Sequence, residues 1–131
     1  MELRIYKHTT VKEIQGQFSR HFSFLKLEFF LYRHPTGDDV LFNKEIFSGL
    51  YLKETSDFFK EGLICFSPST TIMELEQEFQ IELGLVAKVF RRGGDVWVDT
   101  SQTGHLSLAK QNNMGAGLSR SIRSNMHTLF L

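Results

Sequence analysis

The chain has 131 residues, 41% of them hydrophobic, and its 15 Lys and Arg residues balance its 15 Asp and Glu residues. This composition predicts one packed domain and speaks against a general nucleic-acid binder, whose affinity would depend on excess positive charge. Because no apolar run approaches the roughly 20 residues of a membrane span and no leader opens the chain, we expect a cytoplasmic protein without a membrane partner.

The first predicted unit is strand, helix, strand. Residues 3–6 alternate between apolar and polar, which is typical of a half-buried strand. Thr10 and Glu13 have the spacing of a capping box and predict a helix start. Residues 25–31 alternate again and predict a second strand. The helical stripe between the strands consists of Val11, Ile14, Phe18 and Phe22.

The middle of the chain, residues 34–61, starts with a turn-forming stretch at 34–39 and continues with several apolar clusters. Such a density of apolar residues is too high for a mobile linker. We therefore expect a packed insert, containing a short helix or an extra strand.

The strand–helix–strand order returns 61 residues later. Thr71 and Glu74 repeat the capping spacing, and Gly84 is placed to end the helix. Strand-like residues 85–90 come next, then a turn and residues 96–98. Agreement of cap, stripe and strand phase at one offset predicts an internal duplication, with halves at about 1–33 and 62–100. The second stripe consists of Ile72, Leu75, Phe79 and Leu83.

Two such units in tandem predict an α+β domain over residues 1–113. The expected arrangement is a ferredoxin-like split β-α-β, with one mainly antiparallel sheet and both helices on one face. A β-grasp sheet is the alternative. A short helix is expected near 106–113 and is broken by Gly115-Ala116-Gly117, so that 114–131 form a tail, disordered or an amphipathic helix.

The hairpin predicts an exposed aromatic face. If Gly93-Gly94 form a two-residue turn, Phe90 pairs with Trp97, on the side away from the helices, while Val96 faces them. Strand phase places further aromatic and basic residues on that outer side. The candidate interaction surface consists of Tyr6, Phe30, Tyr32, Lys88, Phe90, Arg92 and Trp97.

No motif in the chain predicts a catalytic, cofactor-binding or metal-binding residue. Cys65 lies within a strand and is interpreted as a small buried hydrophobe, and one cysteine allows no intramolecular disulfide or thiolate cluster. Asp38-Asp39 come after a turn and are interpreted as a solvated loop, and Gly115-Ala116-Gly117 is an incomplete phosphate-binding turn. The histidines lack paired metal-ligand spacing; they are His8, His21, His34, His105 and His127.

A longer pattern runs through the hairpin and beyond it. It consists of Phe90-Arg91-Arg92-Gly93-Gly94-Asp95-Val96-Trp97, Thr100, Thr103, Leu106-Ser107-Leu108 and Gln111-Asn112. With the strand–helix–strand repeat, it resembles a group of small bacterial proteins that has no established reaction. The resemblance covers most of residues 1–113 and implies the same fold. That group has an acidic pair and a tryptophan before the Thr-Leu, where this chain has Gly104-His105-Leu106.

These patterns leave three hypotheses of function. The first is a non-enzymatic interaction or scaffold module, binding a protein partner or a second copy through the aromatic face. The second is a single-stranded nucleic-acid-binding domain with an open sheet, which the zero net charge disfavours. The third is an enzyme of unknown reaction that uses His105 or Asp38-Asp39. The sequence does not identify the partner, the ligand or the process.

Overall fold

The computed structural model describes residues 1–33, 40–42 and 49–117. Residues 108–117 form a third helix in addition to the labelled elements. The labelled elements are β1 (Glu2–Ile5), α1 (Val11–His21), β2 (Leu25–Arg33), β3 (Val40–Phe42), η1 (Leu52–Thr55), β4 (Gly62–Cys65), α2 (Ile72–Leu83), β5 (Val86–Gly93), β6 (Val96–Asp99) and η2 (Ser101–Thr103), where η denotes a 3₁₀ helix.

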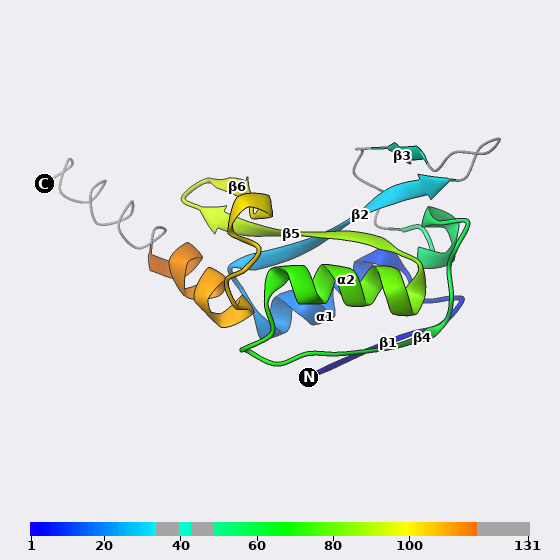
Figure 1. The fold of residues 1–131 in the computed structure, drawn as a ribbon, viewed down its shortest axis with the longest axis horizontal. Helices are drawn as coiled ribbons and strands as arrows, with labels where there is room; N and C mark the ends of the chain where they lie inside the picture. Colours follow the sequence, from blue (N-terminus) through cyan, green and yellow to red (C-terminus); the bar gives the residue numbers. More distant parts are fainter. Residues whose placement is uncertain (34–39, 43–48, 118–131) are drawn as a thin grey trace, which may run out of the picture.

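The described strands form two antiparallel sheets. β1 pairs with β4 alone, and the larger sheet has the order β3-β2-β5-β6. Helices α1 and α2 lie between the two sheets, as Figure 1 shows. The predicted α+β class is confirmed, but the single sheet expected for a ferredoxin-like or β-grasp arrangement is wrong. The apolar side chains of β1 and β4 instead pack on the helix layer from the side opposite β2 and β5, which gives the helices a second buried surface.

Local signals place the helix ends as predicted. The Thr10 hydroxyl accepts from the Glu13 N–H at 3.2 Å, and the Glu13 carboxylate accepts from the Thr10 N–H at 3.4 Å. The Thr71 hydroxyl likewise accepts from the Glu74 N–H at 3.1 Å. Gly84 ends α2 with φ at 65°, in the left-handed region that favours glycine. Both helices therefore start at their predicted caps, and α2 ends at its predicted glycine.

The core lies on both sides of the helix layer. The predicted stripes of α1 and α2 are buried, and so is the inward alternation of β2. This continuity makes one hydrophobic core rather than two. Its buried members are Leu3, Ile5, Val11, Ile14, Phe18, Phe22, Leu25, Leu27, Phe29, Leu52, Ile64, Phe66, Ile72, Leu75, Phe79, Leu83, Leu85, Ala87, Val89 and Leu108.

The two halves meet across a local two-fold arrangement. Leu3 pairs with Ile64 in the β1–β4 ladder, and Glu28 pairs with Lys88 in the β2–β5 ladder. Both pairs join positions that the predicted duplication places in correspondence. Equivalent residues pair at the centre of a ladder when two like units face each other across an axis. The strand order β3-β2-β5-β6 has the same symmetry.

The correspondence extends past the predicted repeat halves. The Leu52 N–H donates to the Thr9 carbonyl at 2.9 Å, and the Leu108 N–H donates to the Thr70 carbonyl at 2.8 Å. Residues 50–52 and 106–108 thus return to the start of α1 and α2 respectively in the same way. Since β3 and β6 also occupy equivalent positions in the sheet, β3 and residues 50–52 are the counterparts of β6 and residues 106–108.

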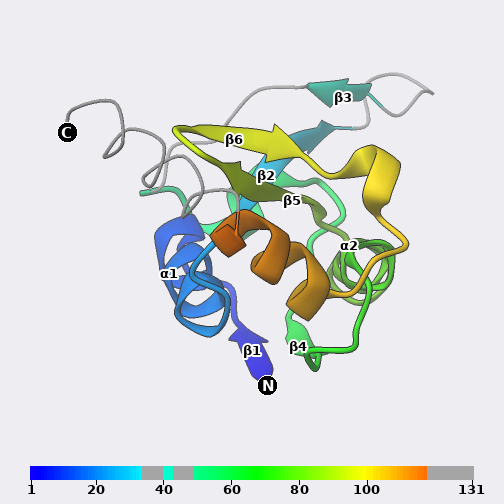
Figure 2. The same ribbon diagram turned by 90° about the vertical axis from the view of Figure 1, so that its left-hand side faces the viewer.

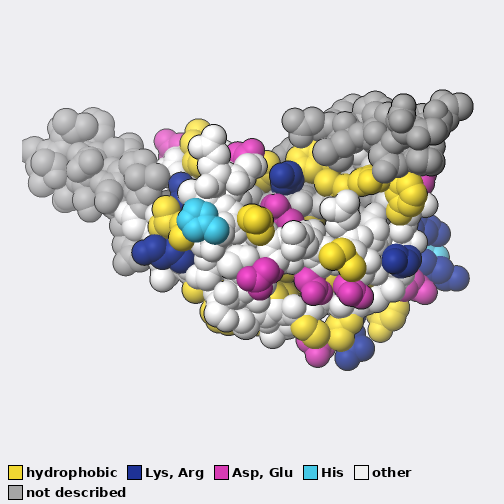
Figure 3. Space-filling model, in the orientation of Figure 1, with side chains coloured by type: hydrophobic (Ala, Val, Ile, Leu, Met, Phe, Trp, Pro, Cys, Tyr) yellow, Lys and Arg dark blue, Asp and Glu magenta, His cyan; other side chains and the backbone are white. Residues whose placement is uncertain are grey.

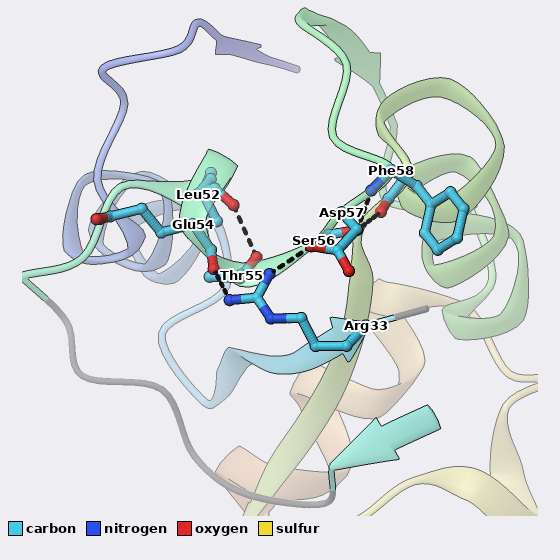
Figure 4. Close-up of polar contacts among 8 residues, drawn as sticks. Arg33, Leu52, Glu54, Thr55, Ser56, Asp57 and Phe58 are labelled. Atoms are coloured by element: carbon cyan, nitrogen blue, oxygen red, sulfur yellow. Dashed lines mark hydrogen bonds and ion pairs between the residues drawn. The ribbon is translucent and has the colours of Figure 1, made fainter. Parts of the chain in front are cut away.

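The end of η1 and the residues directly after it form polar contacts with the end of β2. The Arg33 guanidinium donates to the Glu54 carbonyl at 2.6 Å and lies 3.1 Å from the Asp57 carboxylate (Figure 4). The Ser56 hydroxyl donates to the Gly84 carbonyl at 2.6 Å. These contacts connect β2 to the C-terminal end of α2, close to where β5 begins.

The third helix covers one end of the helix layer, in front of α1 and α2 in Figure 2. It contains Gly115-Ala116-Gly117, so the prediction that these residues break the helix is wrong. A Cβ at Gly115 would lie 3.0 Å from the Phe24 Cβ and 3.1 Å from the Arg92 carbonyl oxygen. Glycine therefore allows the helix to approach the hairpin closely. The rest of the predicted tail, 118–131, lies outside the described residues.

Candidate functional site on the outer face of the larger sheet

The hairpin turn is one position later than predicted. Gly94 has φ at 67°, and Gly93 pairs with Val96. Phe90 consequently pairs with Asp99, and Arg92 pairs with Trp97. The predicted Phe90–Trp97 pair is wrong, but each residue keeps its face, because the partner moves by two positions. Val96 is 61% exposed, so the prediction that it meets the helices is also wrong.

Six of the seven predicted surface residues share the outer face of the larger sheet. The ladder pairs Phe90 with Lys26, which lies on the side opposite the buried Leu27 and Leu25. The exception is Tyr6, which comes directly after β1. It therefore lies near the smaller sheet, where it lines a hollow together with Arg4. The six are Phe30, Tyr32, Lys88, Phe90, Arg92 and Trp97.

Four residues of the outer face form what we call the cation–aromatic cluster: Lys26, Phe90, Arg92 and Trp97. The Lys26 ammonium lies 5.2 Å from the centre of the Trp97 ring and 5.6 Å from that of Phe90. The Arg92 guanidinium carbon lies 5.3 Å from the Trp97 ring. All of these distances fall within the range of cation–π attraction. Two cations of the same sheet therefore lie against the Trp97 indole.

Polar contacts fix the two cations in place. The Lys26 ammonium forms an ion pair with the Glu28 carboxylate at 2.9 Å. The Arg92 Nε–H donates to the Gly94 carbonyl at 2.7 Å. Sequence reasoning missed Lys26 and Glu28, because it did not determine which strand pairs with residues 25–31. The alternation within residues 25–31 was the signal that could have found them.

The outer face is not uniformly open. Phe30 is only 7% exposed, and Tyr32 is half-buried with its ring edge-on to Phe58 at 5.1 Å. Phe90 is half-buried, whereas Trp97 retains 36% of its surface. The accessible part of the face is therefore the β6 side, around Trp97.

The longer sequence pattern holds the third helix against the hairpin. The Arg91 guanidinium donates to the Gln111 side-chain carbonyl at 2.9 Å, and the buried Gln111 amide donates to the Thr103 carbonyl at 2.8 Å. The Thr100 hydroxyl donates to the Val89 carbonyl at 2.6 Å, and the Asn112 side chain accepts from the Phe24 N–H at 2.8 Å. These pattern residues have architectural roles.

Glu76 connects α2 to the edge of β5. Its carboxylate accepts from the Val89 N–H at 2.9 Å. Burial raises the pKa of the Glu76 carboxyl, and this outweighs the lowering by the Val89 hydrogen bond and by the positive charge of Lys88. The ionised form is thus less favourable in the folded chain than in the unfolded one.

We expect Glu76→Gln to gain stability relative to the natural chain as pH rises. A carboxyl whose pKa is raised by folding loses stability as pH rises from its unfolded pKa through its folded pKa, and glutamine has no such charge. Glutamine can still accept from the Val89 N–H. The measurement is the free energy of unfolding of both proteins from pH 4 to pH 8. A constant difference over this range would show that Glu76 does not titrate abnormally.

The other polar candidates do not form a site in the described part of the chain. His8 lies edge-on to Tyr51 and His21 edge-on to Phe66, while Cys65 is exposed. The interpretation of Cys65 as buried is therefore wrong; on β4 only Ile64 faces the core. Within 1–33, 40–42 and 49–117, no three His, Cys, Asp or Glu side chains are grouped to hold a metal.

Two further observations limit the alternatives. His105 is exposed, whereas His34, His127 and Asp38-Asp39 lie outside the described residues. The described residues therefore contain no group of neighbouring polar side chains that supports the enzyme hypothesis. No helix in the described ranges has the length and apolarity needed to cross a bilayer.

Comparison of the chain with models of protein families, with curated proteins and with solved structures finds no match. The resemblance to a group of small bacterial proteins therefore stays a prediction.

Proposed function

We propose that this protein is a non-enzymatic interaction module whose contact surface is the cation–aromatic cluster on the outer face of the larger sheet. The observation that supports the proposal is the position of Trp97 on the edge strand β6, where 36% of its surface is exposed. Tryptophan and arginine are the residues that most often dominate the binding energy of protein interfaces. A second copy of the chain is the partner tested first.

Trp97→Ala should weaken self-association strongly while leaving the fold intact. Loss of a central interface tryptophan costs about 2 kcal/mol or more, or roughly 30-fold in the dissociation constant. The readout is sedimentation equilibrium over a range of protein concentrations, with circular dichroism as the check of folding. Unfolding of this variant would contradict the proposal, since the ring would then belong to the core.

Val96→Ala is the matched control for this experiment. Val96 neighbours Trp97 on β6, is 61% exposed, and lies on the opposite face of the strand. We expect its self-association to equal that of the natural chain. A natural chain that stays monomeric at its highest soluble concentration would exclude the second copy as the partner.

A single-stranded nucleic acid is the second candidate, because two cations flank the exposed indole. The same cations also occupy positions over the ring that a stacked base would need, which favours the protein partner. Repeating the Trp97→Ala comparison with single-stranded RNA at low salt decides between them. RNA binding that falls steeply with added salt and is lost in the variant would support the nucleic-acid function.

A further inference from the structure

β6 is an edge strand of the larger sheet, and the side that faces away from β5 is free. Gly93 and Val96 flank the two-residue turn and therefore form a hydrogen-bonded pair. Because backbone directions alternate along a strand, the N–H and C=O groups of Trp97 and Asp99 point away from β5. These groups make no hydrogen bond to any other part of the chain that the structure describes. Both residues are exposed, so a partner can reach them.

The sequence of β6 lacks the residues that most often protect an edge strand from pairing. It reads Val-Trp-Val-Asp and contains neither lysine nor proline. Trp97 and Asp99 both lie on the outer face, because they pair with the outer-face residues Arg92 and Phe90 of β5. Figure 3 shows hydrophobic and acidic side chains next to one another over β6. The edge therefore combines free backbone groups with an exposed indole and a carboxylate.

The acidic residues near the two ends of β6 restrict how two copies can pair through this edge. Antiparallel pairing that joins the outward groups across a two-fold axis can be centred on Trp97, Val98 or Asp99. A centre at Trp97 places Asp95 opposite Asp99 of the second copy, and a centre at Asp99 places two Asp99 residues opposite each other. Like charges directly opposite are destabilising. Only the centre at Val98, which places Trp97 opposite Asp99 of the second copy, avoids this repulsion.

Opposite charges on the outer face favour the same register. The Arg92 guanidinium carbon lies 5.3 Å from the Trp97 ring, so this side chain extends from β5 over β6. Asp99 of the second copy would lie directly beyond the indole, within reach of Arg92. The Asp99 carboxylate accepts from the Ser101 hydroxyl and from the Ser101 N–H at 2.7 Å. These hydrogen bonds lower the pKa of Asp99 and keep the carboxylate charged.

We propose that a second copy of this chain pairs with β6 as an antiparallel strand centred on Val98, with an Arg92–Asp99 ion pair on each side of the axis. This inference rests on the proposed function, because it names the partner of the cation–aromatic cluster and its orientation. Each Trp97–Asp99 pair exchanges two backbone hydrogen bonds. The two larger sheets become one continuous sheet, and the two-fold symmetry closes the assembly as a dimer.

An exchange of charge between two variants tests this register. Arg92→Asp places an acid opposite Asp99 of the second copy, and Asp99→Arg places a cation opposite Arg92. Each variant alone should self-associate at least about tenfold more weakly than the natural chain, because both attractive contacts become repulsive. An equimolar mixture should recover most of the association, since every contact then joins opposite charges. Sedimentation equilibrium gives the readout, with circular dichroism as the check of folding.

A milder variant covers the case in which Asp99→Arg disturbs the end of β6. Asp99→Asn keeps a side-chain oxygen that accepts from the Ser101 N–H and removes only the charge. We expect it to weaken self-association about threefold. An unchanged association constant would show that Asp99 does not contact Arg92 of a second copy, and the inference would be wrong.

Hydrogen exchange separates this inference from the proposed function. The Trp97 and Asp99 amides should become protected as protein concentration rises, whereas the Val96 amide, which already pairs with Gly93, should not change. Self-association that depends on Trp97 without recovery in the mixture would leave the proposed function standing and overturn the strand pairing. Protection of both amides at every concentration would show that the edge is covered within one chain, which also overturns it. A natural chain that stays monomeric would exclude the second copy in both proposals.

Discussion

Gly84→Ala is expected to destabilise the protein by about 2–5 kcal/mol, as the sum of a left-handed backbone and a steric conflict. Gly84 has φ at 65°, and a Cβ there would lie 2.0 Å from the Phe58 carbonyl oxygen. That oxygen belongs to the backbone, so either the end of α2 or the segment around Phe58, which Arg33 contacts through Asp57, must move. Chemical denaturation of both proteins gives the difference in the free energy of unfolding.

Gly16→Ala is the matched control, with the opposite sign. Gly16 is an exposed residue inside α1, and apart from its chain neighbours and the backbone of its own helix no heavy atom lies within 4 Å of the Cβ position. Alanine there should stabilise the chain by about 0.5–1 kcal/mol. Equal effects of the two substitutions would mean that the backbone conformation at Gly84 is not the one described.

Phe79→Ala should destabilise the protein by about 3–5 kcal/mol, the usual cost of removing a fully buried aromatic ring. Phe79 has no exposed surface, and its ring contacts that of Phe29 edge-on at 5.5 Å. It joins α2 to the centre of the larger sheet. Thermal and chemical unfolding measure the loss.

Ile81→Ala serves as the control on the same helix. Ile81 is 67% exposed, so its truncation should change the free energy of unfolding by less than about 0.5 kcal/mol. A loss at Ile81 comparable with that at Phe79 would indicate that the outward face of α2 is covered in solution.

Local signals in the sequence were sufficient for the starts of α1 and α2 and for the end of α2. The caps at Thr10 and Thr71 and the stop at Gly84 depend on contacts within a few residues, so spacing alone predicts them. The choice of sheet partner depends on distant contacts instead. Nothing near Leu3 distinguishes a β1 that joins the larger sheet from one that pairs with β4, and the predicted single sheet failed there.

The sequence predicted which face of the sheet carries the candidate surface, but it did not predict the strand pairing or the burial of individual residues. The phase of Trp97 is correct because a hairpin shift that moves partners by two positions preserves the face. The exact turn was ambiguous, since Gly93-Gly94 and Gly94-Asp95 both suit a tight reversal. Burial of Phe30 and the place of Tyr6 depend on tertiary packing that no local pattern shows.

The pairing of the two halves has a consequence for how the chain acquires its structure. Leu3 must find Ile64, and Glu28 must find Lys88, each about sixty positions away. Contacts between such distant positions raise the contact order. Folds of this kind form slowly, because the entropy lost in closing long loops comes before the contacts that stabilise the fold. During synthesis the first half would leave the ribosome with its pairing edges still vacant, so the last third of the chain must emerge before the core can close.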